Sequence, residues 1–158
     1  MKSYSLGIGV SAVALVADQI SKALVLANAE TLDAGVSVFP SFNLIFHRNY
    51  GVTFGFFKNV PWWGLALIAT AIVLFLAVSL VRSTRKSEAV AYGLIIGGAL
   101  GNIADRFRFG GVTDFLDLYI GTAHWPTFNL ADVFILCGAG LVLIVSSRDQ
   151  TLAAKATE

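Results

Sequence analysis

Residues 62–81 read WWGLALIATAIVLFLAVSLV, an apolar stretch without a charge or a proline. Roughly 30 Å of bilayer hydrocarbon takes about 20 such residues to cross as a helix. The two tryptophans at its start suit the interface between lipid and water. This stretch therefore predicts a transmembrane helix.

The composition of the 158-residue chain agrees with a membrane protein. Hydrophobic residues make up 56%, charged residues 13%, and the mean hydropathy is +0.75. So few charges would cover a small soluble domain poorly. A net charge of +1 argues against nucleic acid as a partner, and a single cysteine excludes a disulfide framework. We expect one membrane domain over residues 1–150.

Three further stretches predict spans, so the expected fold is an all-α membrane bundle of four transmembrane helices. The third span carries Gly93, Gly97 and Gly101, a spacing that lets helices approach closely in lipid. Cys137, in the fourth span, is expected to be a buried small hydrophobe. Besides 62–81, the spans cover about residues 6–27, 89–104 and 130–147.

The first span has an alternative interpretation as a cleavable signal peptide. Lys2, the apolar stretch and the small residues at 27–29 fit that pattern loosely. Asp18 and Lys22 would be unusual before such a cleavage site, and at i, i+4 they share a helix face and can pair. We therefore favour a retained span.

Lysines and arginines predict the orientation of the bundle. The short loop between the second and third spans holds Arg82, Arg85 and Lys86, and Lys2 and Arg148 flank the first and fourth spans on that side. Both termini are therefore predicted to be cytoplasmic. The segments that then face outward are 28–61 and 105–129.

The first outer segment alternates in places, with Val36 and Val38 followed by Phe42, Leu44 and Phe46. This pattern predicts a small β element on the membrane surface. The second outer segment mixes glycines, aromatic residues and acids without clear alternation. The tail at 151–158 is predicted to be disordered.

Two aspartates at the predicted outer face could act together. Asp132 lies where the fourth span begins, and with Asn129 as N-cap it could simply start the helix. Asp114 precedes Phe115 and Leu116, whose apolar surroundings would raise its pKa, although it could be an ordinary loop aspartate. Two neighbouring carboxyls cannot both ionise easily, and aspartic proteases use such a pair to activate water.

Other chemistries have less support. The only histidines are His47 and His124, and no metal-binding motif is present, so we expect no metal. Ser21 and Lys22 are adjacent and point in different directions on a helix, which disfavours a Ser–Lys enzyme. A small ion-coupled transporter or channel using the outer aspartates remains an alternative, although the span centres are nearly free of charge. A scaffold that dimerises through its glycines would leave the outer acids unexplained.

Five segments, in order, resemble the signatures of the lipoprotein signal peptidases (signal peptidase II). Each is weak alone, but five in order with a four-span layout are specific. Thr53 and Ala104 are small departures, at positions where the family often has alanine and a larger aliphatic residue. The segments are DQISK at 18–22, NYGVTFG at 49–55, GGALGNIADR at 97–106, VTDFLD at 112–117 and FNLAD at 128–132.

The resemblance implies an aspartyl endopeptidase of the bacterial inner membrane, with its active site at the extracytoplasmic face. Its substrates would be prolipoproteins, cut just before a cysteine that carries a diacylglyceryl group. It implies no metal or organic cofactor. Membrane lipid would be the other partner, and we expect a monomer.

By motif, Asp114 and Asp132 would be the catalytic pair, and the β element would form a cradle over them. Arg106 could also pair with the adjacent Asp105 or bind a substrate carbonyl. Residues that would bind substrate or orient the site are Asn49, Gly51, Asn102, Arg106 and Asn129, and structural support would come from Asp18, Lys22 and Asp105.

Overall fold

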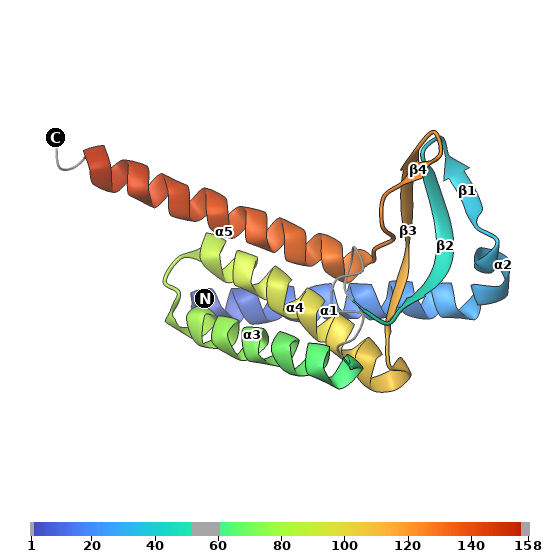
Figure 1. Ribbon diagram of the computed structural model, residues 1–158. Coiled ribbons are helices and arrows are strands. Elements are labelled where there is room, and N and C mark those ends of the chain that lie inside the picture. Colours follow the sequence, from blue (N-terminus) through green and yellow to red (C-terminus); the bar gives the residue numbers. More distant parts are fainter. Residues whose placement is uncertain (1, 52–60, 156–158) are drawn as a thin grey trace.

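The computed structural model describes residues 2–51 and 61–155 (Figure 1). Within these residues, four helices are long and apolar enough to cross a membrane, which confirms the predicted bundle. Thr53 lies outside the described residues. The four helices are α1 (Ser3–Ala27), α3 (Trp62–Arg82), α4 (Lys86–Phe109) and α5 (Leu130–Lys155), of which Leu130–Ser147 forms the span.

The third spanning helix, α4, extends beyond its predicted limits at both ends. Its C-terminus is set by Gly110, whose left-handed conformation (φ 69°) commonly terminates helices. Asp105 and Arg106 therefore lie in the last turns of a helix rather than in an outer segment over 105–129.

α4 is the central helix of the bundle and packs against α1, α3 and α5 (Figure 1). A Cβ on Gly97 would lie 2.5 Å from the Ser11 carbonyl oxygen of α1, and one on Gly98 would lie 2.5 Å from the Ala131 carbonyl oxygen of α5. Both helices therefore approach α4 more closely than a side chain would allow. The predicted role of the glycines in helix packing is confirmed.

α1 begins and α5 ends at the same end of the bundle (Figure 1). That this end faces the cytoplasm stays a prediction. α1 packs along α4 and buries the charged side chains of Asp18 and Lys22 inside the protein. This integral position argues against a cleavable first segment.

A four-stranded antiparallel sheet lies across the end of the bundle opposite the start of α1 (Figure 1). It follows the short helix α2 (Ala29–Asp33), and its strand order is β1-β2-β3-β4. The predicted β element is confirmed by the first two strands. The strands are β1 (Val36–Phe39), β2 (Phe42–Asn49), β3 (Val112–Ile120) and β4 (Ala123–His124).

β3 is the element that the sequence did not reveal. It pairs with β2 and carries Asp114, which is therefore not a loop residue. The first four residues of β3 are all buried, and polar Thr113 and Asp114 are among them. Because neither side of this stretch faces water, apolar and polar residues do not alternate as in a half-exposed strand.

Two further expectations differ from the structure. Cys137 is exposed, because α5 packs mainly on α4 and leaves much of its surface uncovered. The sequence predicts a disordered tail over 151–158, but α5 continues to Lys155. Leucine and alanine at 152–154 are good helix formers, which accounts for the extension.

Candidate active site

Asp132 and Asn129 form the start of α5. The Asp132 backbone N–H donates to Asn129 Oδ1 at 3.1 Å, and the Asn129 N–H donates to Asp132 Oδ2 at 3.2 Å. This reciprocal pair is a capping box, and it confirms the predicted helix-start role. Because the cap uses only Oδ2, the other oxygen of Asp132 is left for a second partner.

Asp114 is brought to this helix start by backbone pairing. The N–H groups of Phe115 and Leu116 both donate to the Phe128 carbonyl at 2.9 Å, and the Phe128 N–H donates back to Leu116 at 3.2 Å. The residue after Phe128 is Asn129, whose Nδ2 donates to Asp114 Oδ1 at 2.6 Å. The loop between the two aspartates therefore returns to β3.

The second oxygen of Asp114 is held from the neighbouring strand. Asn49 pairs with Val112 in the β2–β3 register, and its Nδ2 donates to Asp114 Oδ2 at 2.9 Å. The Oδ1 of Asn49 accepts from the Gly51 N–H at 3.0 Å. Asn49 thus fixes both the carboxyl of Asp114 and the chain that follows β2.

Asn102 of α4 joins the two aspartates. Its Nδ2 donates to Asp132 Oδ1 at 2.9 Å, and its Oδ1 accepts from Asn129 Nδ2 at 3.2 Å. Asn129 in turn bonds Asp114, so the two carboxyls share one amide network. Asp114 and Asp132 also interact electrostatically, as two close acids do.

Burial dominates the protonation of Asp114, whose exposed fraction is 1%. Its pKa is raised to about 7, mainly by burial and also by the charge of Asp132, while the hydrogen bonds from Asn49 and Asn129 act to lower it. Near neutral pH this carboxyl therefore holds a proton for much of the time.

A buried ionic cluster supports the site. Lys22 Nζ lies 2.9 Å from Asp18 Oδ2 and 3.6 Å from Asp105 Oδ2. The other oxygen of Asp18 accepts from the Ala131 N–H of α5 at 2.9 Å, and Asp105 Oδ2 accepts from the Thr113 N–H at 2.8 Å. The predicted Asp18–Lys22 pair is confirmed, and this cluster ties α1 to α4, α5 and β3.

Arg106 reaches the same region from the last turns of α4. It donates to the carbonyls of Asn102 at 3.3 Å and Gly51 at 3.4 Å, and it interacts electrostatically with both Asp114 and Asp132. Asp105, the acid that it was expected to pair with, also acts on Arg106 electrostatically, but its carboxyl lies 3.6 Å from Lys22 Nζ and accepts from the Thr113 N–H. All ten predicted site residues therefore gather at the sheet end of the bundle.

Sequence reasoning missed two contributors. Gln19 donates to Asp18, to the Gly101 carbonyl and to Asp105, at 3.2 to 3.3 Å. Its position inside the DQISK motif was the available signal. The backbone N–H of Thr113 was not foreseeable, because β3 itself was not predicted.

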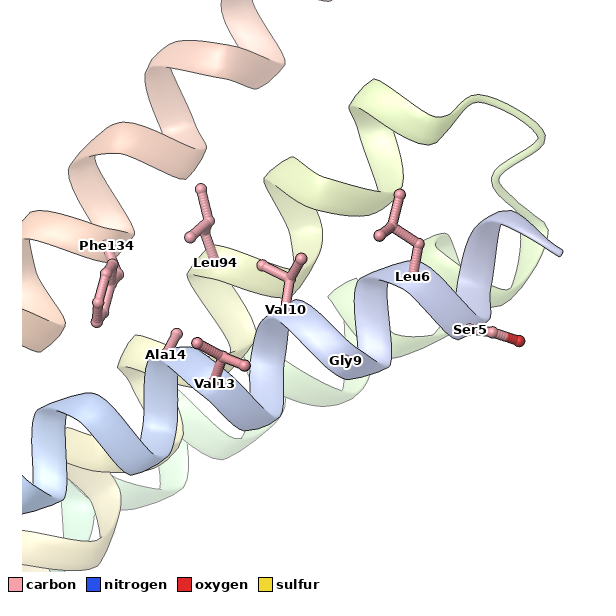
Figure 2. Close-up of a pocket in the computed structure, with 8 residues that line it drawn as sticks. All are labelled: Ser5, Leu6, Gly9, Val10, Val13, Ala14, Leu94 and Phe134. Atoms are coloured by element: carbon pink, nitrogen blue, oxygen red, sulfur yellow. The ribbon is translucent and has the colours of Figure 1, made fainter. Parts of the chain in front are cut away.

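An apolar pocket elsewhere in the bundle does not contain this chemistry. Figure 2 shows an apolar pocket of about 380 Å³ lined by α1, with Leu94 of α4 and Phe134 of α5, and it holds no titratable side chain. Among the described residues, no group of His, Cys, Asp and Glu could hold a metal ion.

Two electrostatically interacting aspartates, the fully buried Asp114 and the partly buried Asp132, lie at one end of a membrane bundle, which is the arrangement of an aspartic-type membrane peptidase. Within that class, the chain belongs to the signal peptidase II family, whose model, described as signal peptidase (SPase) II, matches residues 10–148. The protein is thus a multi-pass membrane protein, and the transporter alternative finds no support.

Curated relatives and solved structures agree with this assignment. The lipoprotein signal peptidase of Serratia proteamaculans (strain 568) is 47% identical over 137 residues, which cover 84% of this chain and 80% of the relative. That of Photorhabdus laumondii is 45% identical over 139 residues, covering 85% and 83%. A solved bacterial membrane enzyme (in meso method, 2.3 Å resolution) superposes with a TM-score of 0.81 at 28% identity, covering 91% of this chain and 88% of that one.

Proposed function

We propose that this protein removes the signal peptide from prolipoproteins by cutting just before a diacylglyceryl-modified cysteine, with Asp114 and Asp132 as the catalytic pair. The observation that carries the proposal is the shared amide network of Asn102 and Asn129, which holds both carboxyls at one place. The signal peptidase activity of the relatives supports the substrate class.

In this reaction the pair holds one proton. Asp114 carries it, which its raised pKa of about 7 supports. Asp132 is the carboxylate, at a helix N-terminus where the dipole favours negative charge. A water between them attacks the scissile carbonyl carbon while Asp132 takes a water proton and Asp114 protonates the carbonyl oxygen.

Collapse of the resulting tetrahedral diol completes the cut. Asp132 returns its proton to the leaving nitrogen, the C–N bond breaks, and Asp114 regains a proton from the diol. The products are a free signal peptide and a lipoprotein that begins with the lipidated cysteine. Arg106, whose guanidinium lies beside the Gly51 carbonyl, is suited to hold a backbone carbonyl of the substrate.

The location of the site fits a substrate embedded in lipid. The pair lies at the sheet end of the spans, so an apolar signal helix could stay in the bilayer while its cleavage site meets water. We propose that this end faces outward from the bacterial inner membrane and that both termini are cytoplasmic. We further propose that the protein acts as a monomer.

Cleavage in vitro of a lipidated precursor and its unlipidated form tests the proposal. We expect cleavage of the lipidated precursor alone, and D114N and D132N should each lower kcat about 10⁴-fold or more. The matched control is D117N, since the Asp117 carboxyl bonds Asn43 and His124 instead of the site. Full activity of either D114N or D132N, or equal cleavage of both precursors, would overturn the proposal.

A further inference from the structure

Lys22 is the largest fully buried side chain in the described part of the protein, and the reaction above does not use it. Its exposed fraction is 1%. Its ammonium lies 2.9 Å from Asp18 Oδ2 and donates to Asn102 Oδ1 at 2.8 Å, and Asp105 Oδ2 lies 3.6 Å away as a longer ion pair. The ion pair with Asp18 lies within α1, and Asp18 itself ties α1 to α5 through the Ala131 N–H. The contact of Lys22 with Asn102 therefore needs a separate explanation.

The contact with Asn102, together with the donor from Asn129 Nδ2, determines which way the Asn102 amide points. The two ends of an asparagine amide have the same shape, but only the oxygen accepts hydrogen bonds. Because an ammonium can only donate, it holds Oδ1 of Asn102 toward itself. Nδ2 must then face the opposite way, where it donates to Asp132 Oδ1 at 2.9 Å.

The charge of Lys22 also reaches the aspartate pair. Burial raises the pKa of Asp114 to about 7, and the ammonium of Lys22 is among the weaker influences that lower it. Arg106 interacts with the same carboxyls from α4, and the β2 neighbour of Asp114 is the exposed His47. The charged and titratable groups around Lys22 and Asp114 are Asp18, Asp105, Arg106, Asp132 and His47.

We infer that Lys22 is a positioning residue of the reaction. Its ammonium helps to hold the Asn102 amide in the orientation that donates to Asp132, and its charge favours the ionised form of Asp114. Asp18 balances that charge while it caps α5 through the Ala131 N–H. The inference rests on the proposed function, and it goes beyond structural support.

Two variants with opposite charge changes test it through the pH dependence of kcat. K22M removes the cation and keeps most of the volume, so Asp114 should keep its proton to higher pH. The fall in kcat at high pH (the basic limb) should therefore move to higher pH, and kcat should fall about tenfold or more with little change in KM. D18N removes the anion and can still accept from Ala131, so the basic limb should move down.

A double variant tests whether Lys22 acts through Asn102. N102A removes the amide, so K22M should add little to the loss of kcat in the N102A protein. If the loss of kcat in the double variant equals the product of the losses in K22M and N102A, the two residues act independently and the positioning role is overturned. S11A, at a buried α1 position two turns from Asp18, is the control for helix packing and should leave the pH profile in place.

Shifts of the basic limb in the same direction for K22M and D18N, or lower thermal stability with an unchanged profile, would overturn the inference. If K22M fails to fold, the D18N variant alone tests the inference. An unchanged pH dependence of kcat in D18N would then overturn the role of Lys22. The infrared carboxyl band of Asp114, assigned by its loss in D114N, gives the same titration without substrate. A wild-type protein that leaves the lipidated precursor uncut would refute the proposed function, while the infrared shifts still decide the inference about Lys22.

Discussion

Asn129 donates a 2.6 Å hydrogen bond to Asp114, although the two residues belong to different elements. The same residue forms the N-cap of α5 through Asp132. One side chain therefore fixes the start of a membrane helix and the position of the buried acid on β3. The geometry of the aspartate pair depends on it more than on any direct contact between the carboxyls.

Replacing this asparagine should therefore damage both folding and turnover. N129A removes the cap and the bond to Asp114, so we expect a loss of about 1 kcal/mol or more of stability and a fall in kcat of about 100-fold. Thermal unfolding and the cleavage assay measure the two effects. N28A is the matched control, because the exposed Asn28 side chain bonds only the Leu24 carbonyl among the described contacts, and its activity should be near wild type. An N129A enzyme with wild-type kcat would contradict this role.

The activity should depend on pH with two limbs. Because Asp114 must carry a proton and its pKa is about 7, kcat should fall as the pH rises through about 7. It should fall again at low pH, when both acids become protonated. A kcat profile that stays flat up to about pH 9 would contradict the assignment of the proton to Asp114.

The same carboxyl should make stability depend on pH. Its pKa rises from 3.8 to about 7 on folding, so the folded protein binds the proton more tightly. The contribution of the protonated Asp114 carboxyl to stability is therefore fully present below about pH 4 and is lost as the pH rises through about 7. The D114N protein has no carboxyl to ionise at this position. Its Tm should therefore rise relative to the wild-type Tm as the pH increases from about 5 to about 8. A constant difference would show that the carboxyl is not desolvated.

Close packing of α1 on α4 can be tested at a single glycine. In G97A the added methyl would lie 2.5 Å from the Ser11 carbonyl oxygen, so the helices must separate, and we expect a loss of about 1–3 kcal/mol. G9A is the control, because no atom lies within 4 Å of a Cβ built there. Equal stability of the two variants in thermal unfolding would argue against the close approach.

Chelation is the last test. The reaction derived above uses two carboxyls and a water, so EDTA should leave kcat unchanged. Strong inhibition that an added divalent metal reverses would contradict this chemistry.

The sequence predicted the spans and the start of α5 because both signals are local, whereas the aspartate pair came from the family resemblance. Length and hydropathy define a span, and Asn129 with Asp132 forms a recognisable helix start. β3 was missed because Thr113 and Asp114 occupy buried positions, which removes the alternation that identifies a strand. The full length of α4 could have been read from Gly110, a common helix terminator.

The partners within the site could not be predicted from the sequence. Asp105 and Arg106 are adjacent, yet successive residues on a helix point in different directions. Asp105 faces Lys22 of α1, and Arg106 faces the segment after β2. Only the packing of α4 against its neighbours decides such choices.

The hydrogen bond between Asp18 and the Ala131 N–H joins the first membrane helix to the last. Asp132 is the next residue, so it enters the membrane only when the final segment of the newly made chain is inserted. A chain whose first three membrane helices are inserted without α5 therefore lacks one acid of the proposed catalytic pair.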